Sequence, residues 1–184
     1  PETEMQMSMG PSVIGRFSRA GGKPTFGCDI ISNNSGDLLI QARLGLQTER
    51  MLECAQSLRQ RHGATEITMT TADMVRAMTV NAAGALGLAD RIGTLTVGKD
   101  ADLILVRLDD INTMPLHDAC ATLLLHVHPG NVDTVMVAGR VLKRHGRLVA
   151  DLASARRAIM ASHAHIQSAI ERDRSTLPPG YQAA

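Results

Sequence analysis

Apolar residues recur with the period of an α-helix over a long stretch in the first half of the chain. Between Asp37 and about Arg61, leucine and alanine return every three to four positions, which predicts an amphipathic helix that ends at His62-Gly63. Shorter helices are predicted over residues 12–20 and 154–172. The long helix is expected to face the core with Leu38, Leu39, Ala42, Leu46, Leu52, Ala55 and Leu58.

A second helical pattern opens at Thr70-Thr-Ala-Asp73. A threonine followed three residues later by an acidic residue has the form of a capping box, in which each side chain binds a backbone N–H group of the other residue. This helix is predicted to run through Met74 to Leu88. The small side chains of Ala82 and Ala83 would let a neighbouring segment pack closely against it.

A short run of β-forming residues, Pro24-Thr-Phe-Gly-Cys28, predicts one buried strand. Asp29 follows at the carboxyl end of this strand, and a polar loop over residues 30–36 leads into the long helix. In α/β folds, binding and catalytic groups gather where strands end. Asp29 is therefore the first candidate for a functional residue.

From Ile92 onward the apolar pattern changes from helical to extended. Gly98-Lys99 and Ala138-Gly139 supply turn residues, each between two short runs of strand-forming side chains. We expect these runs to form one small sheet, separate from residues 24–28. The predicted strands are residues 94–99, 101–106, 132–137 and 141–142.

The same pattern divides the chain into successive regions. Residues 1–90 are predicted to form the strand-and-helix part, residues 91–150 short strands with turns, and residues 151–184 a terminal helix and tail. The methionine-rich residues 1–10 are typical of a flexible loop or of gap-filling side chains. The tail at Leu177-Pro-Pro-Gly180 is expected to fray.

Composition indicates a folded protein and narrows its partners. Of the 184 residues, 44% are hydrophobic and 20% are charged, so a packed core is feasible. The 19 basic and 18 acidic residues leave a net charge of +1, which gives no electrostatic reason to expect nucleic acid or an anionic membrane. With no Trp, one Tyr and two Phe, aromatic platforms for stacking bases are missing as well.

Cysteine usage favours a reducing compartment. Cys28, Cys54 and Cys120 are scattered and odd in number, so they match neither a zinc motif nor a disulfide framework. No apolar run approaches the ~18 residues of a membrane span, and the opening residues lack a signal-peptide pattern. We therefore expect a cytoplasmic protein with no membrane partner.

Two histidine pairs could in principle bind a metal ion. His126 and His128 would share one face of a strand, although their position favours packing or exposure. His163 and His165 lie two apart on a predicted helix, where their side chains diverge and make poor joint ligands.

Two segments of the sequence match a known pattern when they are taken together. One is Ile92-Gly-Thr-Leu-Thr-Val-Gly-Lys-Asp-Ala-Asp-Leu-Ile-Leu105, preceded by Met78-Thr-Val-Asn-Ala-Ala-Gly-Ala-Leu-Gly87 and followed by Val132-Asp-Thr-Val-Met-Val-Ala-Gly-Arg140. The other is Phe26-Gly-Cys-Asp29 followed by Ser32-Asn-Asn34. Over about residues 1–150, they resemble the C-terminal part of the metal-dependent amidohydrolase superfamily, in the branch of cytosine and guanine deaminases and triazine hydrolases.

The resemblance implies an α/β fold: the C-terminal part of a (β/α)8 TIM-type barrel, a small β-sandwich segment and a terminal helix. Residues 1–90 would hold the last barrel strands and helices, and residues 91–150 the sandwich part. It also implies a hydrolase that acts on C–N bonds, for example a deaminase of an amino-substituted heterocycle. Its cofactor would be a divalent metal, zinc in preference to iron, and its substrate a small molecule.

Site residues are implied by position. The family's last barrel strand carries an aspartate that is both metal ligand and proton shuttle, and Asp29 is the matching residue. Glu4 lies where the family usually has Pro-x-Ser-Asn after the preceding strand, and Ser32 and Asn33 follow Asp29, so these three are the candidate substrate-binding residues. Taken alone, Asp29, Ser32 and Asn33 are equally typical of turns, and Glu2 and Glu4 of solvated surface.

One departure from the family concerns the other metal ligands. The family also needs a His-x-His pair from its first strand and a histidine from a middle strand, and residues 1–90 hold neither. We therefore expect this chain to be a C-terminal piece of an enzyme, inactive alone, with the missing N-terminal half of the same enzyme as a partner. Open sheet edges and exposed apolar helix faces would make the piece a homo-oligomer or cause it to aggregate.

The alternative is a non-catalytic binding or oligomerisation module in which the same motifs only maintain a fold. Several polar residues are expected to be structural under either hypothesis. Lys99 should point outward beside the Gly98 turn, Asp102 should bind local backbone, and Cys28 should be a small core residue.

Overall fold

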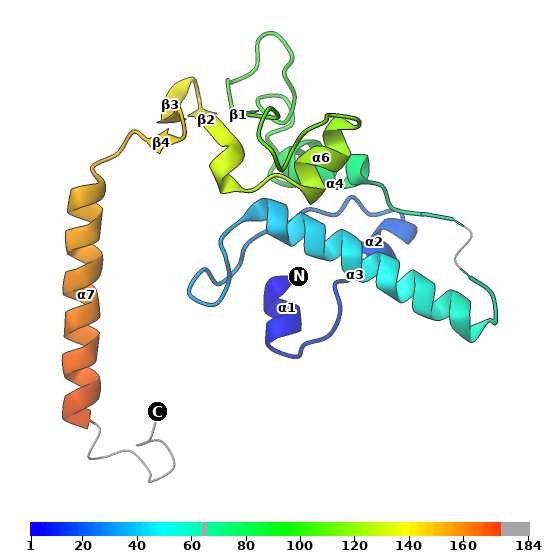
Figure 1. Cartoon of the computed structure of the whole chain (residues 1–184), viewed down its shortest axis with the longest axis horizontal. Helices are drawn as coiled ribbons and strands as arrows, with labels where there is room; N and C mark the ends of the chain where they lie inside the picture. The colour runs from blue at the N-terminus through cyan, green and yellow to red at the C-terminus, as the bar shows by residue number, and fades with distance from the viewer. Residues whose placement is uncertain (64–65, 174–184) are drawn as a thin grey trace. The chain divides into compact units, whose positions relative to one another are not determined.

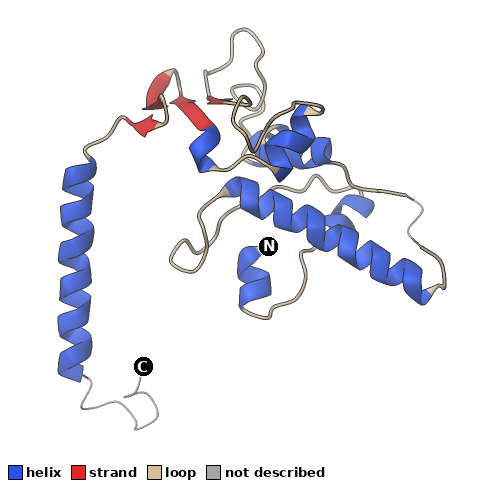
Figure 2. Cartoon of the chain, viewed as in Figure 1, coloured by secondary structure: helices blue, strands red, loops and turns tan. Residues whose placement is uncertain are grey.

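Helix α3, Leu38–Arg59, is the long element of the first of two units, which comprise Pro1–Arg147 and Leu148–Ala184 (Figure 1). The computed structural model describes residues 1–63 and 66–173. Helices account for most of the regular structure in the first unit, and its strands are confined to a small sheet (Figure 2). The other helices of this unit are α1 Glu2–Gln6, α2 Ile14–Arg19, α4 Thr71–Met78, α5 Val80–Ala85, α6 Ala119–Leu125 and the short 3-10 helix η1 Pro129–Asn131.

Helix α3 begins at the predicted residue. The Asp37 backbone is extended, and its carboxylate accepts a hydrogen bond from the backbone N–H of Leu39 at 2.9 Å, which makes Asp37 the N-cap. The predicted core face is only partly confirmed, because Ala42 and Leu46 are fully buried whereas Leu58 is 63% exposed. The apolar face of α3 is therefore covered over its first turns and open toward its carboxyl end.

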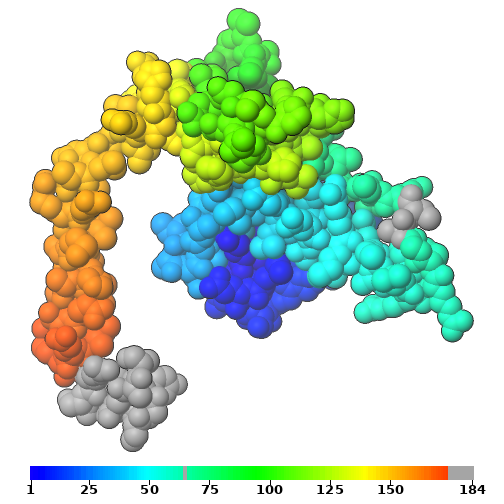
Figure 3. All heavy atoms as spheres, viewed as in Figure 1, coloured from blue at the N-terminus to red at the C-terminus, as the bar shows by residue number. Residues whose placement is uncertain are grey.

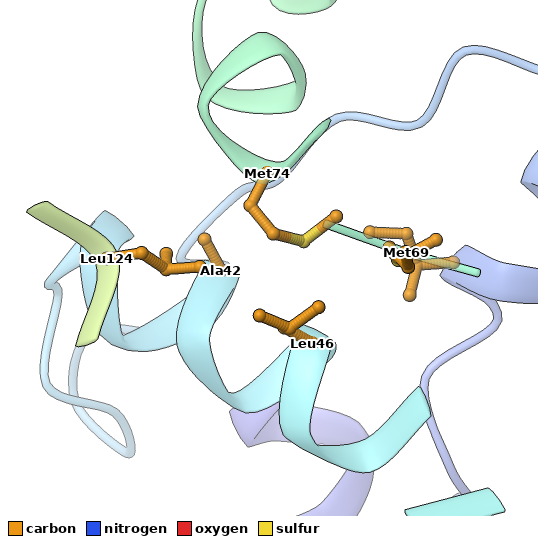
Figure 4. Close-up of a cluster of buried hydrophobic side chains, with 6 residues drawn as sticks. Ala42, Leu46, Met69, Met74 and Leu124 are labelled. Carbon is orange, nitrogen blue, oxygen red and sulfur yellow. The ribbon is translucent and has the colours of Figure 1, made fainter. Parts of the chain in front are cut away.

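The core of the first unit is a small apolar cluster centred on α3 (Figure 4). Leu46 and Leu124 are 0% exposed and Met74 is 1% exposed, although these residues lie far apart in the sequence. Burial of their side chains therefore holds α3, α4 and α6 together. The cluster consists of Ile14, Ala42, Leu46, Met69, Met74 and Leu124.

Arg43 adds polar bonds beside this core. Its Nε donates to the carbonyl oxygen of Leu124 at 2.8 Å, and its Nη2 donates to the carbonyl oxygen of Val127 at 2.8 Å. The last carbonyl groups of a helix lack partners within the helix, so a side-chain donor stabilises them. Arg43 thus joins α3 to the carboxyl end of α6.

Helix α2 packs very closely on α3 at Gly15. The carboxylate of Glu49, whose residue is 2% exposed, accepts a hydrogen bond from Nη1 of Arg19 at 2.5 Å. A Cβ atom at Gly15 would lie 1.9 Å from the Glu49 carboxyl carbon, so no side chain fits at this position. The predicted helix over residues 12–20 is confirmed in this place.

The capping box at the start of α4 is confirmed. The Thr70 side chain accepts from the backbone N–H of Asp73 at 3.2 Å, and the Asp73 carboxylate accepts from the backbone N–H of Thr70 at 2.9 Å. A single helix to Leu88 is wrong, because α4 ends at Met78 and α5 starts after Thr79. The Thr79 hydroxyl donates to the carbonyl of Val75 at 2.7 Å, a side-chain bond that competes with the helical ladder.

Asp73→Asn is expected to lower the melting temperature at neutral pH by a loss of ~1 kcal/mol, typical of a removed cap. Hydrogen bonds from Thr70 lower the pKa of the Asp73 carboxyl. A lowered folded-state pKa means that the ionised box adds stability above the ordinary aspartate pKa, and that this stability is lost as pH falls through the folded-state value. Thermal melts by circular dichroism across acid and neutral pH would measure the change.

Asp109→Asn is the matched control for this prediction. Asp109 is exposed, and none of the described residues donates a hydrogen bond to its carboxylate. Its replacement should leave the melting temperature nearly constant at every pH. An Asp73→Asn penalty that is as large in acid as at neutral pH would contradict the capping role.

The strands of the first unit form one antiparallel sheet in the order β1-β2-β3-β4. The prediction of one small sheet, separate from residues 24–28, is confirmed for the runs near residues 101–106 and 132–142. It is wrong for residues 94–99, which form turns and bends. The strands are β1 Leu103–Val106, β2 Val132–Val137, β3 Arg140–Arg144 and β4 Arg147–Leu148.

The loop over residues 94–99 is held by polar bonds to the end of α5 rather than by a strand partner. The Lys99 Nζ donates to the carbonyl oxygen of Ala89 at 2.5 Å, so the expectation that Lys99 points outward is wrong. Asp102 does bind backbone, as expected, but the group is not local. Its Oδ1 accepts from the N–H of Ala138 at 2.6 Å, at the turn between β2 and β3.

Residues 24–28 are not assigned as a strand, so that prediction is wrong for this structure. A strand needs the backbone groups of a neighbour, and none of the described residues pairs with this segment in a sheet. Side chains hold it instead. The Asn81 Nδ2 donates to the carbonyl of Pro24 at 3.1 Å, and Phe26 packs against the core cluster.

The second unit contains helix α7, Leu152–Asp173, which confirms the helix predicted over residues 154–172. His163 and His165 lie on it, as predicted. The tail at Leu177-Pro-Pro-Gly180 lies outside the described residues. Among the helices that the structure describes, none combines the length and the apolar character needed to cross a membrane.

Candidate active site

An open cavity of about 540 Å³ lies in the first unit beside the segment that carries Asp29. Glu4 and Asp29, two of the residues singled out from the sequence, both line it, whereas Ser32 and Asn33 do not. Thr3 and Lys23, which the sequence did not suggest, line it as well. Carboxylates, an ammonium group and a hydroxyl therefore surround a space of the size of a small-molecule site.

Asp29 has a backbone conformation that an ordinary residue rarely adopts. Its φ is +51°, in the left-handed region, where aspartate and asparagine are among the few non-glycine residues tolerated. The residue is exposed, and its carboxylate accepts no hydrogen bond from any residue that the structure describes. The turn thus presents a carboxylate whose oxygen atoms remain available to a ligand.

The loop after Asp29 is fastened to α1 by amide side chains. The Asn34 Nδ2 donates to the Thr3 hydroxyl at 2.5 Å and to the carbonyl of Cys28 at 3.2 Å. Gln6 donates to the Asn33 side chain at 2.9 Å. Asn34 therefore fixes the peptide immediately before Asp29, a role that the sequence alone did not separate from turn formation.

Helix α1 is also fastened to α3, and Figure 3 shows the N-terminal residues in blue against the cyan surface of α3. The Glu2 carboxylate accepts hydrogen bonds from the Gln41 side chain and, at 2.9 Å, from the Ser35 hydroxyl. The Glu2 backbone N–H donates to the Gln41 side chain at 3.1 Å. Glu2 is therefore a structural residue, and Glu4 is the one that faces the cavity.

Titration of two groups around the loop is displaced from its ordinary range. A hydrogen bond with the Pro1 amino group, 3.0 Å away, lowers the pKa of the Glu4 carboxyl. Burial raises the pKa of the Cys28 thiol, and the Asp37 and Glu2 carboxylates raise it further. Cys28 therefore remains a thiol at neutral pH, and its expected role as a small packing residue fits this environment better than a nucleophilic role.

Asp29 is an isolated candidate metal ligand. The described residues contain no group of three or more histidine, cysteine, aspartate or glutamate side chains placed to hold an ion. The strand expected to carry His126 and His128 is not formed: His126 ends α6, and His128 caps η1 by accepting from the Gly130 N–H at 3.1 Å. The chain alone therefore does not fit a metal ion.

Comparison with known proteins identifies related sequences. A sequence model of the Amidohydrolase family matches residues 15–142. The 5-methylthioadenosine/S-adenosylhomocysteine deaminase of Moorella thermoacetica is 32% identical over 149 residues, which cover 80% of this chain and 32% of the deaminase. The S-triazine hydrolase of Gordonia rubripertincta is 36% identical over 76 residues, which cover 41% of this chain and 16% of that enzyme.

Solved structures give the same result. An adenosine deaminase from Xanthomonas campestris with bound zinc aligns over 91% of this chain and 36% of its own, with a TM-score of 0.80 and 27% identity. The atrazine chlorohydrolase of Arthrobacter aurescens TC1, complexed with zinc, aligns over 87% and 34%, with a TM-score of 0.73 and 26% identity. This chain spans about a third of the length of the curated deaminases that it matches.

Proposed function

Because this chain belongs to the amidohydrolase family, we propose that it is part of a metal-dependent hydrolase that cleaves a C–N bond and deaminates an amino-substituted heterocycle. The observation that carries the proposal is the position of Asp29, exposed on a left-handed turn in the wall of a 540 Å³ cavity. Family membership supports the reaction class. The named relatives support an aminopurine nucleoside or an aminotriazine as the substrate class.

Asp29 is the proposed proton carrier. Its carboxylate takes a proton from a water molecule as the water oxygen bonds to the ring carbon that bears the amino group. The same proton then passes from Asp29 to the amino nitrogen, which leaves as ammonia when the C–N bond breaks. An exposed carboxylate with no hydrogen bond from the described residues is suited to this exchange.

The cavity supplies groups that could orient the ring. Glu4 accepts hydrogen bonds from ring N–H or ribose hydroxyl groups, and the apolar wall at Phe17 and Phe26 covers the face of the heterocycle. Ser32 and Asn33 lie outside the cavity lining, so we assign them to the outer end of the substrate path. Glu4 is thus the proposed substrate-binding partner of Asp29.

The cofactor we propose is a divalent metal, zinc in preference to iron, with Asp29 as one ligand and the remaining ligands in a segment outside these residues. Bound there, such an ion supplies a water molecule of lowered pKa. Zinc in the two aligned structures supports this choice. The absence of a ligand group among the described residues supports placing the other ligands elsewhere.

The proposed architecture follows the same reasoning. Residues 1–90 would complete a (β/α)8 barrel, with residues 24–28 as its last strand once a neighbouring strand is present. Apolar side chains around this segment are open in the chain as it stands: Val13 is 58% exposed, Phe17 51% and Ile31 74%. Their exposure supports a further segment that packs against them. Residues 91–150 would form the accompanying β-sandwich part.

Metal removal from the complete enzyme tests the function. Dialysis against a chelator is expected to reduce ammonia release from an aminopurine nucleoside to the uncatalysed rate, and added zinc should restore it. The 184-residue chain alone, measured beside it, should release no ammonia with or without zinc.

Each rival hypothesis predicts a different result. Full turnover after the metal has been removed would overturn the metal-dependent reaction. A complete protein that binds aminated heterocycles but never releases ammonia would favour the non-catalytic binding module.

A further inference from the structure

Helix α7 carries an apolar stripe that nothing in its own unit covers. None of its 22 residues is buried. Leu152, Ile159, Ile166 and Ile170 are spaced by seven, seven and four positions, which places them on one face of a helix. Their exposures are 54%, 67%, 52% and 48%. The face is continuous from the first turn of the helix to the last.

Charged side chains flank this stripe in a particular arrangement. At about 100° per residue, Arg156 lies about 40° and Glu171 about 100° from Leu152, on the same side of the stripe. They stand near opposite ends of α7, 15 positions apart, so they cannot contact one another within one helix. Glu171 also lies in the last turn, where the dipole of its own helix disfavours an acidic side chain.

We propose that α7 is a self-association surface and that its partner is the α7 helix of a second copy of this chain, packed antiparallel about a two-fold axis. In this arrangement Ile159 of each copy packs on Ile166 of the other, and the two stripes cover each other along their length. Arg156 of each copy meets Glu171 of the other, so the ion pair forms twice.

The charges select this arrangement over a parallel one. In a parallel pair, Arg156 would lie level with Arg156 of the other copy, and like charges would repel. In the antiparallel pair, Glu171 also lies beside the positive end of the other helix's dipole. Because the surface lies on α7, this inference is independent of the hydrolase activity proposed for the first unit.

Sedimentation velocity of the full chain over a range of concentrations tests the surface. The chain is expected to dimerise, and Ile159→Glu with Ile166→Glu should raise the dimer dissociation constant at least ~10-fold, since charges would enter an apolar interface. Ala161→Glu is the matched control. It places the same side chain on the opposite face of α7 and should leave the dissociation constant unchanged.

A charge exchange tests the orientation. Arg156→Glu alone should weaken the dimer, and the combined Arg156→Glu and Glu171→Arg variant should restore it, because the pair re-forms with its signs exchanged. Unaltered far-ultraviolet circular dichroism would show that α7 remains helical in each variant.

Several outcomes would overturn the proposal. One is a chain that is monomeric at every concentration, with α7 amides protected from exchange by its own first unit. Another is a dimer that the substitutions at Ile159 and Ile166 leave intact, which would place the interface elsewhere. A dimer that Arg156→Glu strengthens would indicate parallel helices and would also refute the arrangement.

Discussion

Replacing Asp29 with asparagine in the complete enzyme should reduce turnover by ~10²–10⁴-fold, the usual contribution of a general base. Asparagine keeps the size of the side chain and one carbonyl oxygen, and it tolerates the left-handed backbone at φ +51°. It cannot accept the proton of the attacking water. Steady-state rates of ammonia release and metal content should be measured on the same preparations, and metal content should fall less than the rate.

Asp102→Asn is the control for a purely structural aspartate. The Asp102 carboxylate accepts from the N–H of Ala138, a residue with φ +48°, at the turn between β2 and β3. Because Asp102 is exposed, its loss should cost about 1 kcal/mol of stability and leave turnover per folded molecule near normal. An Asp29→Asn enzyme with near-normal turnover would end the proton-carrier hypothesis, whatever its metal content.

The helices could be predicted from the sequence because their signals are local. Asp37 and the Thr70-Asp73 pair define two helix starts by bonds made within four residues, and both are present in the structure. The break at Thr79 could not be predicted, since threonine is also common inside helices. Its hydroxyl chooses the Val75 carbonyl only in the folded surroundings.

Strands were predicted less well because their partners are distant in the sequence. β1 pairs with β2, about 30 residues later, and not with residues 94–99 immediately before it. A run of β-forming residues states a preference, but the ladder depends on which backbone groups lie alongside. The Pro24–Cys28 run shows the same limit: the composition suits a strand, and the described residues offer it no partner.

For the candidate site, the sequence identified charged residues but not the side chains that position them. Asp29 and Glu4 line one cavity, as residues of one site should. Asn34 was classed with the turn residues, yet it bridges Thr3 and the Cys28 carbonyl, because α1 lies beside the loop. Such a role depends on contacts between segments about 30 residues apart, which a linear pattern does not contain.

Leu46→Ala should lower the free energy of unfolding of this chain by ~2–5 kcal/mol. Leu46 is 0% exposed at the centre of the cluster that joins α3 to α4 and α6 (Figure 4). The lost methyl groups would leave a cavity against Met74 and Leu124, which the small core cannot fill by moving one helix alone. Urea unfolding monitored by circular dichroism would measure the change.

Leu58→Ala is the matched control, because it is the same substitution on the same helix at a side chain that is 63% exposed. It should change the free energy of unfolding by less than ~0.5 kcal/mol, as is usual at exposed positions. Equal losses for the two variants would mean that the open end of α3 is covered in solution. The core would then extend along α3 beyond the cluster around Leu46.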